Sequence, residues 1–229
     1  MLKRRLIISL CFDRGVLTRT KRFVPDYPYT QSYLSVDSVD EVVLLDVTRS
    51  GSSSDSRVAM RAYAERCFAP VTMGGWIRSW DDAHAYLDLG ADKVVVGSYA
   101  LENPSIICEL ASKMGSQSVV VAVDFPYRTS EPVEWAKTAE NEGAGELFVQ
   151  DQSRDGSLMG YNLPVLREIA KSVNIPVVIG GGCGGWRHMK EGFEAGADGC
   201  VTSVIHHFTQ TSLAGFKKAL LAEGQEIRP

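Results

Sequence analysis

Three aspartates follow apolar runs of the sequence, where their side chains could act as acids or bases. Asp46 ends the run VVLLD, Asp124 ends VVVAVD, and Asp155 lies in SRDGS shortly after LFVQD. Two carboxylates can serve as general acid and general base when their surroundings separate their pKa values. Asp124 is the strongest candidate because a buried-looking run leads directly to it. An ordinary cap or loop hydrogen bond is the alternative role for each aspartate.

Glycines gather behind another apolar run, in the stretch VVIGGGCGG that contains Gly181 and Gly182. Glycine lets backbone N–H groups approach an anion closely, as in phosphate-binding loops. The stretch therefore predicts a phosphate site, with Ser203 of TSV beside it. A tight turn without a ligand is the alternative.

A related stretch, VTMGGW, predicts a second anion site at Gly75, Gly97 and Ser98. Trp76 stands where the first stretch has its third glycine. We therefore expect this second site to be altered, weakened, or used to stack on a ring.

Charged residues stand at the beginnings of four apolar runs: Arg5, Glu41, Lys93 and Glu146. If the runs are parallel strands of one barrel, these side chains converge on the mouth opposite the aspartates. Arg5 and Cys11 are an even number of positions apart on one strand, so their side chains should point to the same face at opposite ends of that strand. Two interpretations remain open, a stabilising ion-pair cluster and a gate to the interior, and spacing alone favours the cluster.

The elements that must position these residues are eight short apolar runs, at 5–12, 42–47, 71–75, 93–98, 118–125, 147–152, 176–181 and 199–204. Continuous apolar strands are typical of parallel sheets covered on both faces. Between them lie segments with helical periodicity, such as 55–67, 104–114 and 162–173, the last with Asn162 as a cap. The alternation predicts an α/β (β/α)8 TIM barrel, with a doubly wound open sheet as the runner-up.

An internal repeat favours the barrel over the open sheet. Gly74 and Gly75 recur as Gly180 and Gly181, and LGAD recurs as AGAD, both at an offset of 106 residues. EVVLLDVTRSGS and ELFVQDQSRDGS match at an offset of 105. A closed barrel with two-fold internal half-barrel repeat explains two such halves. We find no linker between them, so residues 1–229 are expected to form a single domain.

Composition excludes several classes of protein. The net charge of −4 argues against a surface devoted to nucleic acid. No apolar stretch approaches membrane-spanning length, and the first apolar run is read as a strand and not as a signal peptide, so a cytoplasmic protein is expected. The five cysteines include no CxxC pair and the histidines have no ligand spacing, so neither a metal nor a cofactor is indicated.

Nearly the whole chain resembles the cyclase subunit of imidazole glycerol phosphate synthase, and more distantly the related histidine-biosynthetic isomerase. The motifs that carry the resemblance are GADKV at 90–94, LENPS at 101–105, GSQSVVVAVD at 115–124, EGAGE at 142–146, RDGSLMGY at 154–161 and EAGAD at 194–198. The resemblance implies a lyase-type cyclase. Its glutaminase subunit docks on the bottom of the barrel and makes ammonia, which crosses the interior to an aminated ribosyl substrate bearing two phosphates.

The resemblance also implies roles for individual positions. Asp124 and Asp155 match catalytic-face aspartates, with Asp46 as a supporting group. Asp92 matches the residue that communicates with the glutaminase. The remaining matches are a gate quartet of Arg5, Glu41, Lys93 and Glu146, one phosphate site at Gly156, Gly182 and Ser203, and another at Gly75, Gly97 and Ser98. The match to the gate quartet reverses the preference for a purely stabilising cluster.

The chain departs from the family pattern at the end of the first strand. The family's cyclases carry a catalytic aspartate there, and this chain has Cys11, which could act as a nucleophile or simply fill the barrel. The hairpin usual after strand five is also missing. Two alternatives to a cyclase in histidine biosynthesis therefore stay open. One is a paralogue that forwards ammonia to a sugar amidotransferase in surface-polysaccharide synthesis, and the other is an aminoaldose-phosphate isomerase.

Overall fold

A computed structural model describes residues 3–29, 38–203 and 213–228. Eight parallel strands form the central sheet: β1 (Arg5–Asp13), β4 (Glu41–Asp46), β5 (Val71–Gly74), β6 (Lys93–Val96), β7 (Val119–Phe125), β8 (Glu146–Asp151), β9 (Val177–Gly180) and β10 (Gly199–Thr202). Each strand pairs with the next, and β10 pairs in parallel with β1, with Arg5 opposite Gly199. The sheet is therefore a closed barrel, as predicted, and the open-sheet alternative is wrong.

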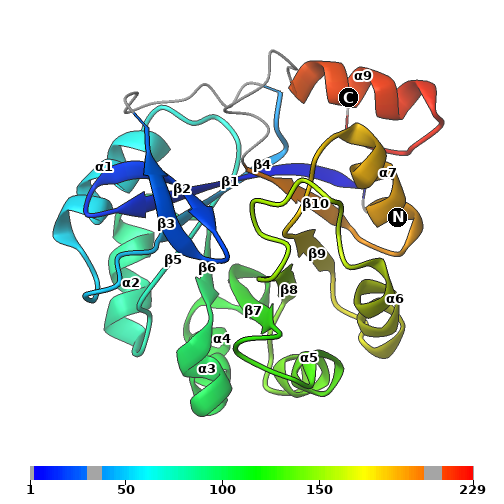
Figure 1. Cartoon of the computed structure of the whole chain (residues 1–229). Helices are drawn as coiled ribbons and strands as arrows, with labels where there is room; N and C mark the ends of the chain where they lie inside the picture. The colour runs from blue at the N-terminus through cyan, green and yellow to red at the C-terminus, as the bar shows by residue number, and fades with distance from the viewer. Residues whose placement is uncertain (1–2, 30–37, 204–212, 229) are drawn as a thin grey trace.

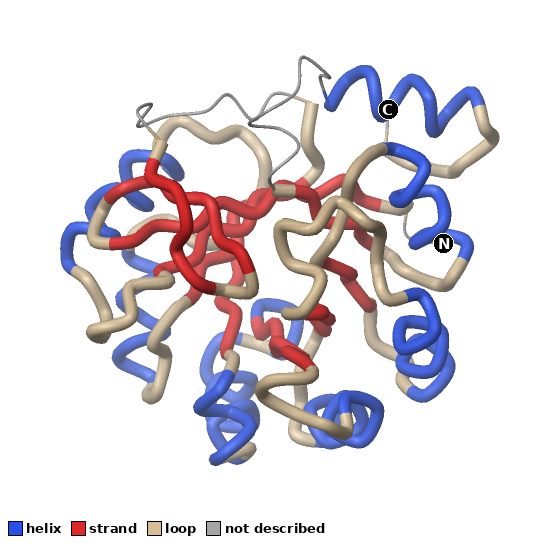
Figure 2. Tube along the Cα trace, viewed as in Figure 1, coloured by secondary structure: helices blue, strands red, loops and turns tan. Residues whose placement is uncertain are grey.

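Helices surround the barrel (Figures 1 and 2). They are α1 (Ser54–Ala64), α2 (Trp80–Asp88), α3 (Ser98–Glu102), α4 (Ser105–Met114), α5 (Pro132–Asn141), α6 (Leu163–Ser172), α7 (Trp186–Glu194) and α9 (Leu213–Ala222), with a 3-10 turn at Ser116–Ser118. Helix α6 begins where its sequence predicts, because the Asn162 side chain accepts a bond from the N–H of Val165 at 3.4 Å.

The apolar residues divide into two layers because side chains alternate along each strand. The larger layer lies between strands and helices and includes Leu6, Leu44 and Leu147. The smaller layer fills the barrel interior, with Ile7, Val43, Val95, Val120, Phe148, Val178 and Val201. Inward and outward faces of every barrel strand can be read from these two layers.

One element was not predicted. After β1 the chain forms an antiparallel hairpin of β2 (Val16–Lys21) and β3 (Val24–Pro28), which extends the sheet beside β1. Arg22 and Phe23 form its turn, and both have positive φ, 54° and 58°. Such a turn normally uses glycine or asparagine, so these residues gave no turn signal in the sequence.

Candidate functional site

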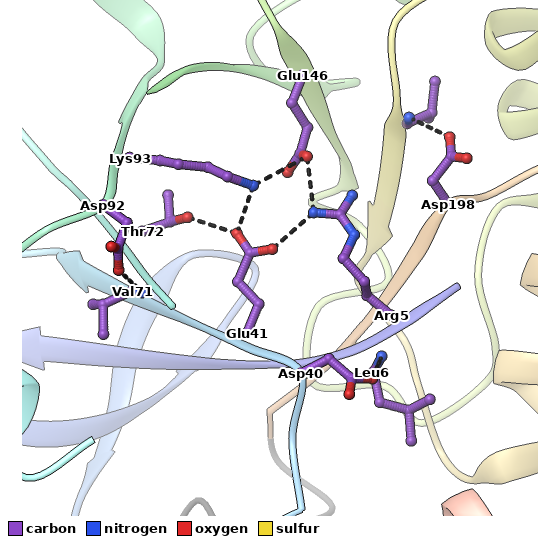
Figure 3. A network of polar contacts seen from close by, with 11 residues as sticks. Arg5, Leu6, Asp40, Glu41, Val71, Thr72, Asp92, Lys93, Glu146 and Asp198 are labelled. Carbon is purple, nitrogen blue, oxygen red and sulfur yellow. Dashed lines mark hydrogen bonds and ion pairs between the residues drawn. The ribbon is translucent and has the colours of Figure 1, made fainter. Parts of the chain in front are cut away.

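The four charged residues at the strand starts lie together at the floor of the barrel (Figure 3). Arg5 Nη1 lies 2.7 Å from a carboxylate oxygen of Glu41 and 2.9 Å from one of Glu146. Lys93 Nζ lies 3.1 Å and 3.2 Å from the same two carboxylates. Positive and negative groups thus alternate around a closed ring, which we call the floor ring.

The pKa values of the two glutamates of the floor ring are shifted in opposite directions. Both glutamates are buried, and burial penalises their charged forms. At Glu41 the charges of Lys93 and Arg5 outweigh this penalty, so its pKa is lowered. At Glu146 burial dominates and the pKa is raised, despite Arg5. The pKa values of these two carboxyl groups therefore lie on opposite sides of the usual value for a glutamate.

A fifth side chain binds to the floor ring from outside its four charged members. The hydroxyl of Thr72, at the start of β5, donates to Glu41 at 2.8 Å. Thr72 was not predicted from the sequence, because only charged residues at the strand starts were considered. Its position at the start of β5 could have indicated this role, because β5 lies between the strands that carry Glu41 and Lys93.

Aspartates just before β6 and β10 hold the same end of the barrel together. Asp92 accepts a hydrogen bond from the N–H of Val71 at 2.7 Å, and Asp198 accepts one from Val177 at 2.9 Å. These two pairs are separated by the 106-residue offset of the sequence repeat. The rest of Asp92 is exposed at the rim of the floor, where the predicted glutaminase would dock.

At the opposite end of the barrel a small pocket opens among the loops. It contains six of the residues predicted from sequence: Cys11, Asp155, Gly156, Gly181, Gly182 and Ser203. The loops after β8, β9 and β10 therefore meet at one place, as expected for a phosphate-binding corner of a barrel. The structure also brings Ser9, Thr20 and Gln150 into this pocket.

Asp124 lies on the inward face at the end of β7, since it is in register with Gln150 and shares parity with Val120. A methyl group added at Gly97 would lie 3.9 Å from its carboxylate oxygen. Desolvation raises the pKa of Asp124 to about 7, and Arg128 offsets only part of this effect. Near neutral pH this carboxyl group can both donate and accept a proton.

Asp155 holds the unpredicted hairpin over the pocket. Its Oδ2 accepts hydrogen bonds from the Thr20 hydroxyl at 2.9 Å and from the Phe23 N–H at 3.0 Å. Burial nevertheless raises the pKa of Asp155. The bond to Phe23 also fixes the strained turn of the hairpin.

Cys11 is buried beneath this hairpin. Burial, followed by the nearby charge of Asp155, raises the pKa of its thiol to about 12. The thiol is thus neutral and protonated near pH 7, which favours the space-filling interpretation over a nucleophile.

Asp46 lies differently from the other two aspartates. Asp46 is an even number of positions from Val42 and Leu44, so its side chain points outward from the barrel, as theirs do. One of its oxygens accepts from the N–H of Thr48 at 3.1 Å and the other from Ser53 at 2.8 Å. These contacts brace the loop before α1, and a catalytic role for Asp46 stays a prediction.

Two glycines of the predicted phosphate loops are required by close packing. A methyl group at Gly75 would lie 2.4 Å from the backbone oxygen of Asp46, and one at Gly181 would lie 2.6 Å from that of Asp151. Both glycines have positive φ. The tight-turn interpretation therefore accounts for these two positions, whether or not an anion binds.

Trp76 directly follows Gly75 of the second predicted anion site. Its indole N–H donates to the backbone oxygen of Thr48 at 2.8 Å, so the ring is held against the loop after β4. Gly97 directly precedes α3, which Ser98 begins. Anion binding by Gly75, Gly97 and Ser98 stays a prediction.

Comparison with known proteins gives a consistent family assignment. Residues 12–212 match the family "Histidine biosynthesis protein". The chain is 34% identical over 252 aligned residues to imidazole glycerol phosphate synthase subunit HisF of Streptococcus sanguinis, covering all of both chains. It is 33% identical to the subunit of that name from Clostridium botulinum, again over both full lengths. With that of Wolinella succinogenes the identity is 34%, over 84% of this chain and 83% of the other.

The chain belongs to the imidazole glycerol phosphate synthase cyclase family of histidine biosynthesis proteins. Because the 252 aligned positions exceed its 229 residues, the alignment contains gaps on its side. This family member is thus shorter than the relatives it matches. Its β7 and α5 are joined by residues 126–131 alone, where the family hairpin was expected to be missing.

Among the residues that the structure describes, no three His, Cys, Asp or Glu side chains gather as metal ligands. None of the helices in the same ranges is long and apolar enough to cross a membrane.

Proposed function

We propose that this protein is the cyclase-type subunit of a glutamine amidotransferase. In this proposal a glutaminase subunit docks on the N-terminal face of the barrel to form a heterodimer. Its ammonia passes the floor ring and crosses the interior to a phosphorylated sugar-type substrate at the opposite mouth. The reaction forms imidazole glycerol phosphate in histidine biosynthesis, as the names of the relatives suggest.

The observation that carries the proposal is the floor ring itself. A ring of four mutually paired charges, two of them buried carboxylates, is an expensive way to close a barrel, because desolvation offsets most of the attraction between the charges. Well-packed apolar residues would serve stability as well. A ring of side chains that can separate and re-pair, by contrast, is suited to admitting a small molecule to the apolar interior behind it.

The interior beyond the floor ring is compatible with a neutral passenger. The inner layer is mostly apolar, and the buried polar residues Ser9 and Thr72 share its inward face. Such a lining disfavours ammonium and accepts neutral ammonia, because a lone charge is costly to desolvate. Glutamine would be held back on steric grounds, because it is much larger than ammonia.

At the mouth, Asp124 is the principal acid or base of the proposed reaction. The raised pKa of about 7 suits proton transfer at neutral pH. Gly156, Gly181, Gly182 and Ser203 would hold one phosphate, and Gly75, Gly97 and Ser98 the other. Asp155 supports the mouth by holding the hairpin, with Asp46 bracing a neighbouring loop.

Cys11 favours a second candidate function. A thiol with a pKa of about 12 cannot replace a catalytic carboxylate at the end of the first strand. Loss of one of two acid and base groups typically lowers a rate by about 10² to 10⁴. The second candidate is therefore a barrel that binds a glutaminase and forwards ammonia to another acceptor, such as a sugar amidotransferase.

Turnover separates the two candidates. The purified chain is given the aminated ribosyl bisphosphate with ammonium chloride, and imidazole glycerol phosphate is measured by mass spectrometry. Product formed faster than by the Asp124→Asn variant supports the cyclase. No product, together with stimulated glutamine hydrolysis by an added glutaminase subunit, supports the forwarding barrel. Absence of both contradicts the proposal.

A further inference from the structure

A groove of about 600 Å³ opens on the outside of the barrel, between α5 and α6. These two helices are neighbours around the barrel (Figure 1). One wall of the groove is the connection from β7 to α5, and the other is the end of β8 with the first turns of α6. The groove shares no lining residue with the pocket at the mouth. It is therefore a separate feature of the same end of the barrel.

The groove combines apolar surface with acidic side chains. Its apolar surface comes from residues that include Phe125, Val133 and Val165. Its carboxylates belong to Glu131, Glu134, Asp151 and Glu168. Among the described residues that line the groove there is no lysine, arginine or histidine. The negative charge of the groove is thus not balanced within its own lining.

Internal hydrogen bonds hold both walls of the groove in place. On one side the N–H of Glu131 donates to the Thr129 hydroxyl at 3.1 Å, and the N–H of Thr129 donates to the backbone oxygen of Asp124 at 3.2 Å. On the other side the Asn162 amide donates to the buried carboxylate of Asp151 at 2.8 Å. A groove that is already formed costs little ordering when a ligand binds.

Glu131 and Glu168 are the carboxylates that a partner can reach. Both are exposed, one on each wall, and neither makes an ion pair within residues 3–29, 38–203 and 213–228. Glu134, by contrast, already pairs with Lys137 at 2.7 Å. Two unpaired negative charges on either side of an apolar strip are complementary to two positive charges on either side of an apolar side chain.

We propose that this groove binds a segment of a second protein in which lysine or arginine flanks an apolar side chain. The inference rests on the forwarding form of the proposed function, in which an acceptor enzyme must be held beside the mouth. The groove is in the right place, because the connection that walls it begins directly after Phe125 at the end of β7. The floor ring lies at the opposite end of the barrel, so a glutaminase and this second partner can bind at once.

Other occupants fit the groove less well. A metal ion is disfavoured because no three carboxylates gather as metal ligands in the part of the chain that the structure describes. A second copy of this chain would bring its own net charge of −4 to an acidic surface, and like charges oppose association. A basic segment of another protein meets neither obstacle.

A synthetic peptide tests the inference on the full-length protein. The probe is a short fluorescent peptide of alternating arginine and leucine, and a peptide with glutamate in place of arginine controls for its charge. Fluorescence anisotropy measures both affinities for the wild type and for the groove variant, which combines Glu131→Gln with Glu168→Gln. The matched control combines Glu102→Gln with Glu191→Gln, because these exposed glutamates do not line the groove and their loss removes the same net charge.

We expect the wild type to bind the arginine peptide and not the glutamate peptide. The groove variant should weaken the arginine peptide by about 3- to 10-fold, the effect of two exposed charge pairs, and the control variant by less than about 2-fold. Val165→Arg, which fills the groove and reverses its charge, should abolish binding. Circular dichroism of each variant reports that the barrel is still folded.

Three results would overturn the inference. The first is no binding of the arginine peptide to the wild type. The second is equal weakening in the groove variant and the control variant, which would show a general attraction to an acidic protein. The third is a wild-type dimer in sedimentation experiments that the groove variant does not form, which would make a second copy the occupant.

Glutamine hydrolysis separates this inference from the proposed function beneath it. The groove variant should leave stimulation of an added glutaminase unchanged, because the groove and the floor ring lie at opposite ends of the barrel. Stimulation without peptide binding would overturn the groove and leave the proposed function. Peptide binding that depends on Glu131 and Glu168, without any stimulation, would support the groove and overturn the docking of a glutaminase.

Discussion

The carboxylate of Asp155 accepts a hydrogen bond of 2.9 Å from the hydroxyl of Thr20, which joins the loop after β8 to the hairpin after β1. The two residues are 135 positions apart in the chain. The contact closes the side of the mouth under which Cys11 is buried. It therefore determines how the pocket is covered.

Replacing Asp155 by alanine should loosen the hairpin. The Thr20 hydroxyl and the Phe23 N–H would lose their acceptor, at a cost of about 1–3 kcal/mol in the free energy of unfolding. Urea denaturation measures this cost, and trypsin should cleave faster after the exposed Lys21 and Arg22. Asp26→Ala is the control, because its ion pair with Arg19 is on the same hairpin and near the surface. Equal effects of the two variants would contradict the role of Asp155.

The floor ring should be sensitive to the loss of Arg5. Arg5→Ala leaves two buried carboxylates with Lys93 as their remaining partner within the ring, which should destabilise the protein by about 3 kcal/mol or more. Lys113→Ala removes an exposed pair with Glu109 and should cost less than about 0.5 kcal/mol. Urea denaturation compares the two. A ring that tolerates Arg5→Ala as easily as the surface tolerates Lys113→Ala is not the buried network described above.

The effect of Asp124→Asn should depend on pH. Burial raises the pKa of Asp124 to about 7 in the folded state, so the wild type loses stability as the pH rises from about 4 to 7, where the unfolded chain releases this proton and the folded chain keeps it. Asparagine removes this penalty, so the variant should gain stability over the wild type as the pH rises from about 4 to 7. The gain should then level off at on the order of 2 kcal/mol, allowing for partial solvent access.

Thermal unfolding at several pH values measures the difference for Asp124→Asn. Below about pH 4 the carboxyl group is protonated in both the folded and the unfolded states, so the two proteins should then be equally stable. A constant difference between pH 4 and pH 8 would show that the carboxyl group titrates normally.

The cysteines should differ in reactivity. Cys108 is exposed, whereas Cys11, Cys183 and Cys200 are buried, and burial raises the pKa of each buried thiol. Ellman's reagent at pH 8 should therefore label Cys108 at once and the buried three only in denaturant. The Cys108→Ser variant should lose the fastest phase and leave the half-buried Cys67 as the next thiol to react. Rapid labelling of Cys11 in the folded Cys108→Ser protein would restore the nucleophile interpretation.

Alanine at Gly75 or Gly181 should disturb the fold directly. Each new methyl group would meet a backbone oxygen at 2.4 Å or 2.6 Å in a left-handed conformation, and we expect a loss of about 2 kcal/mol or more. Gly185 is the matched control, because its φ of 164° is extended and a methyl group there meets no atom within 4 Å. Gly185→Ala should be neutral within about 0.5 kcal/mol. Comparable thermal shifts in all three variants would rule out the packing explanation.

The barrel could be predicted because its strands are buried on both faces. Runs such as VVLLD and VVVAVD are continuous and apolar, and the repeat places them in two matching halves. The floor ring followed from the same pattern. Each member of the floor ring lies two positions before an inward-facing residue of the apolar layer, which holds for Arg5, Glu41, Lys93 and Glu146.

The same parity contained information that the sequence analysis did not use. If Glu41 points inward, Asp46 must point outward, because the two residues are an odd number of positions apart. By the same rule Glu146 places Gln150 on the inward face. Both assignments agree with the structure, and they separate loop-bracing residues from pocket residues.

The hairpin could not be predicted for a physical reason. Its turn uses Arg22 and Phe23 in left-handed conformations, which side chains adopt only when other contacts hold them there. One of those contacts comes from Asp155, far away in the sequence. Such a long-range contact cannot be recognised from the conformational preferences of the residues in the turn.

The rate of glutamine hydrolysis by a glutaminase subunit, measured while this protein is titrated in, tests the central claim most directly. The account predicts saturable stimulation at a one-to-one ratio, and loss of that stimulation in Asp92→Ala, whose side chain lies at the rim of the floor. No stimulation by the wild-type protein, or equal stimulation by Asp92→Ala, would contradict docking at the floor ring.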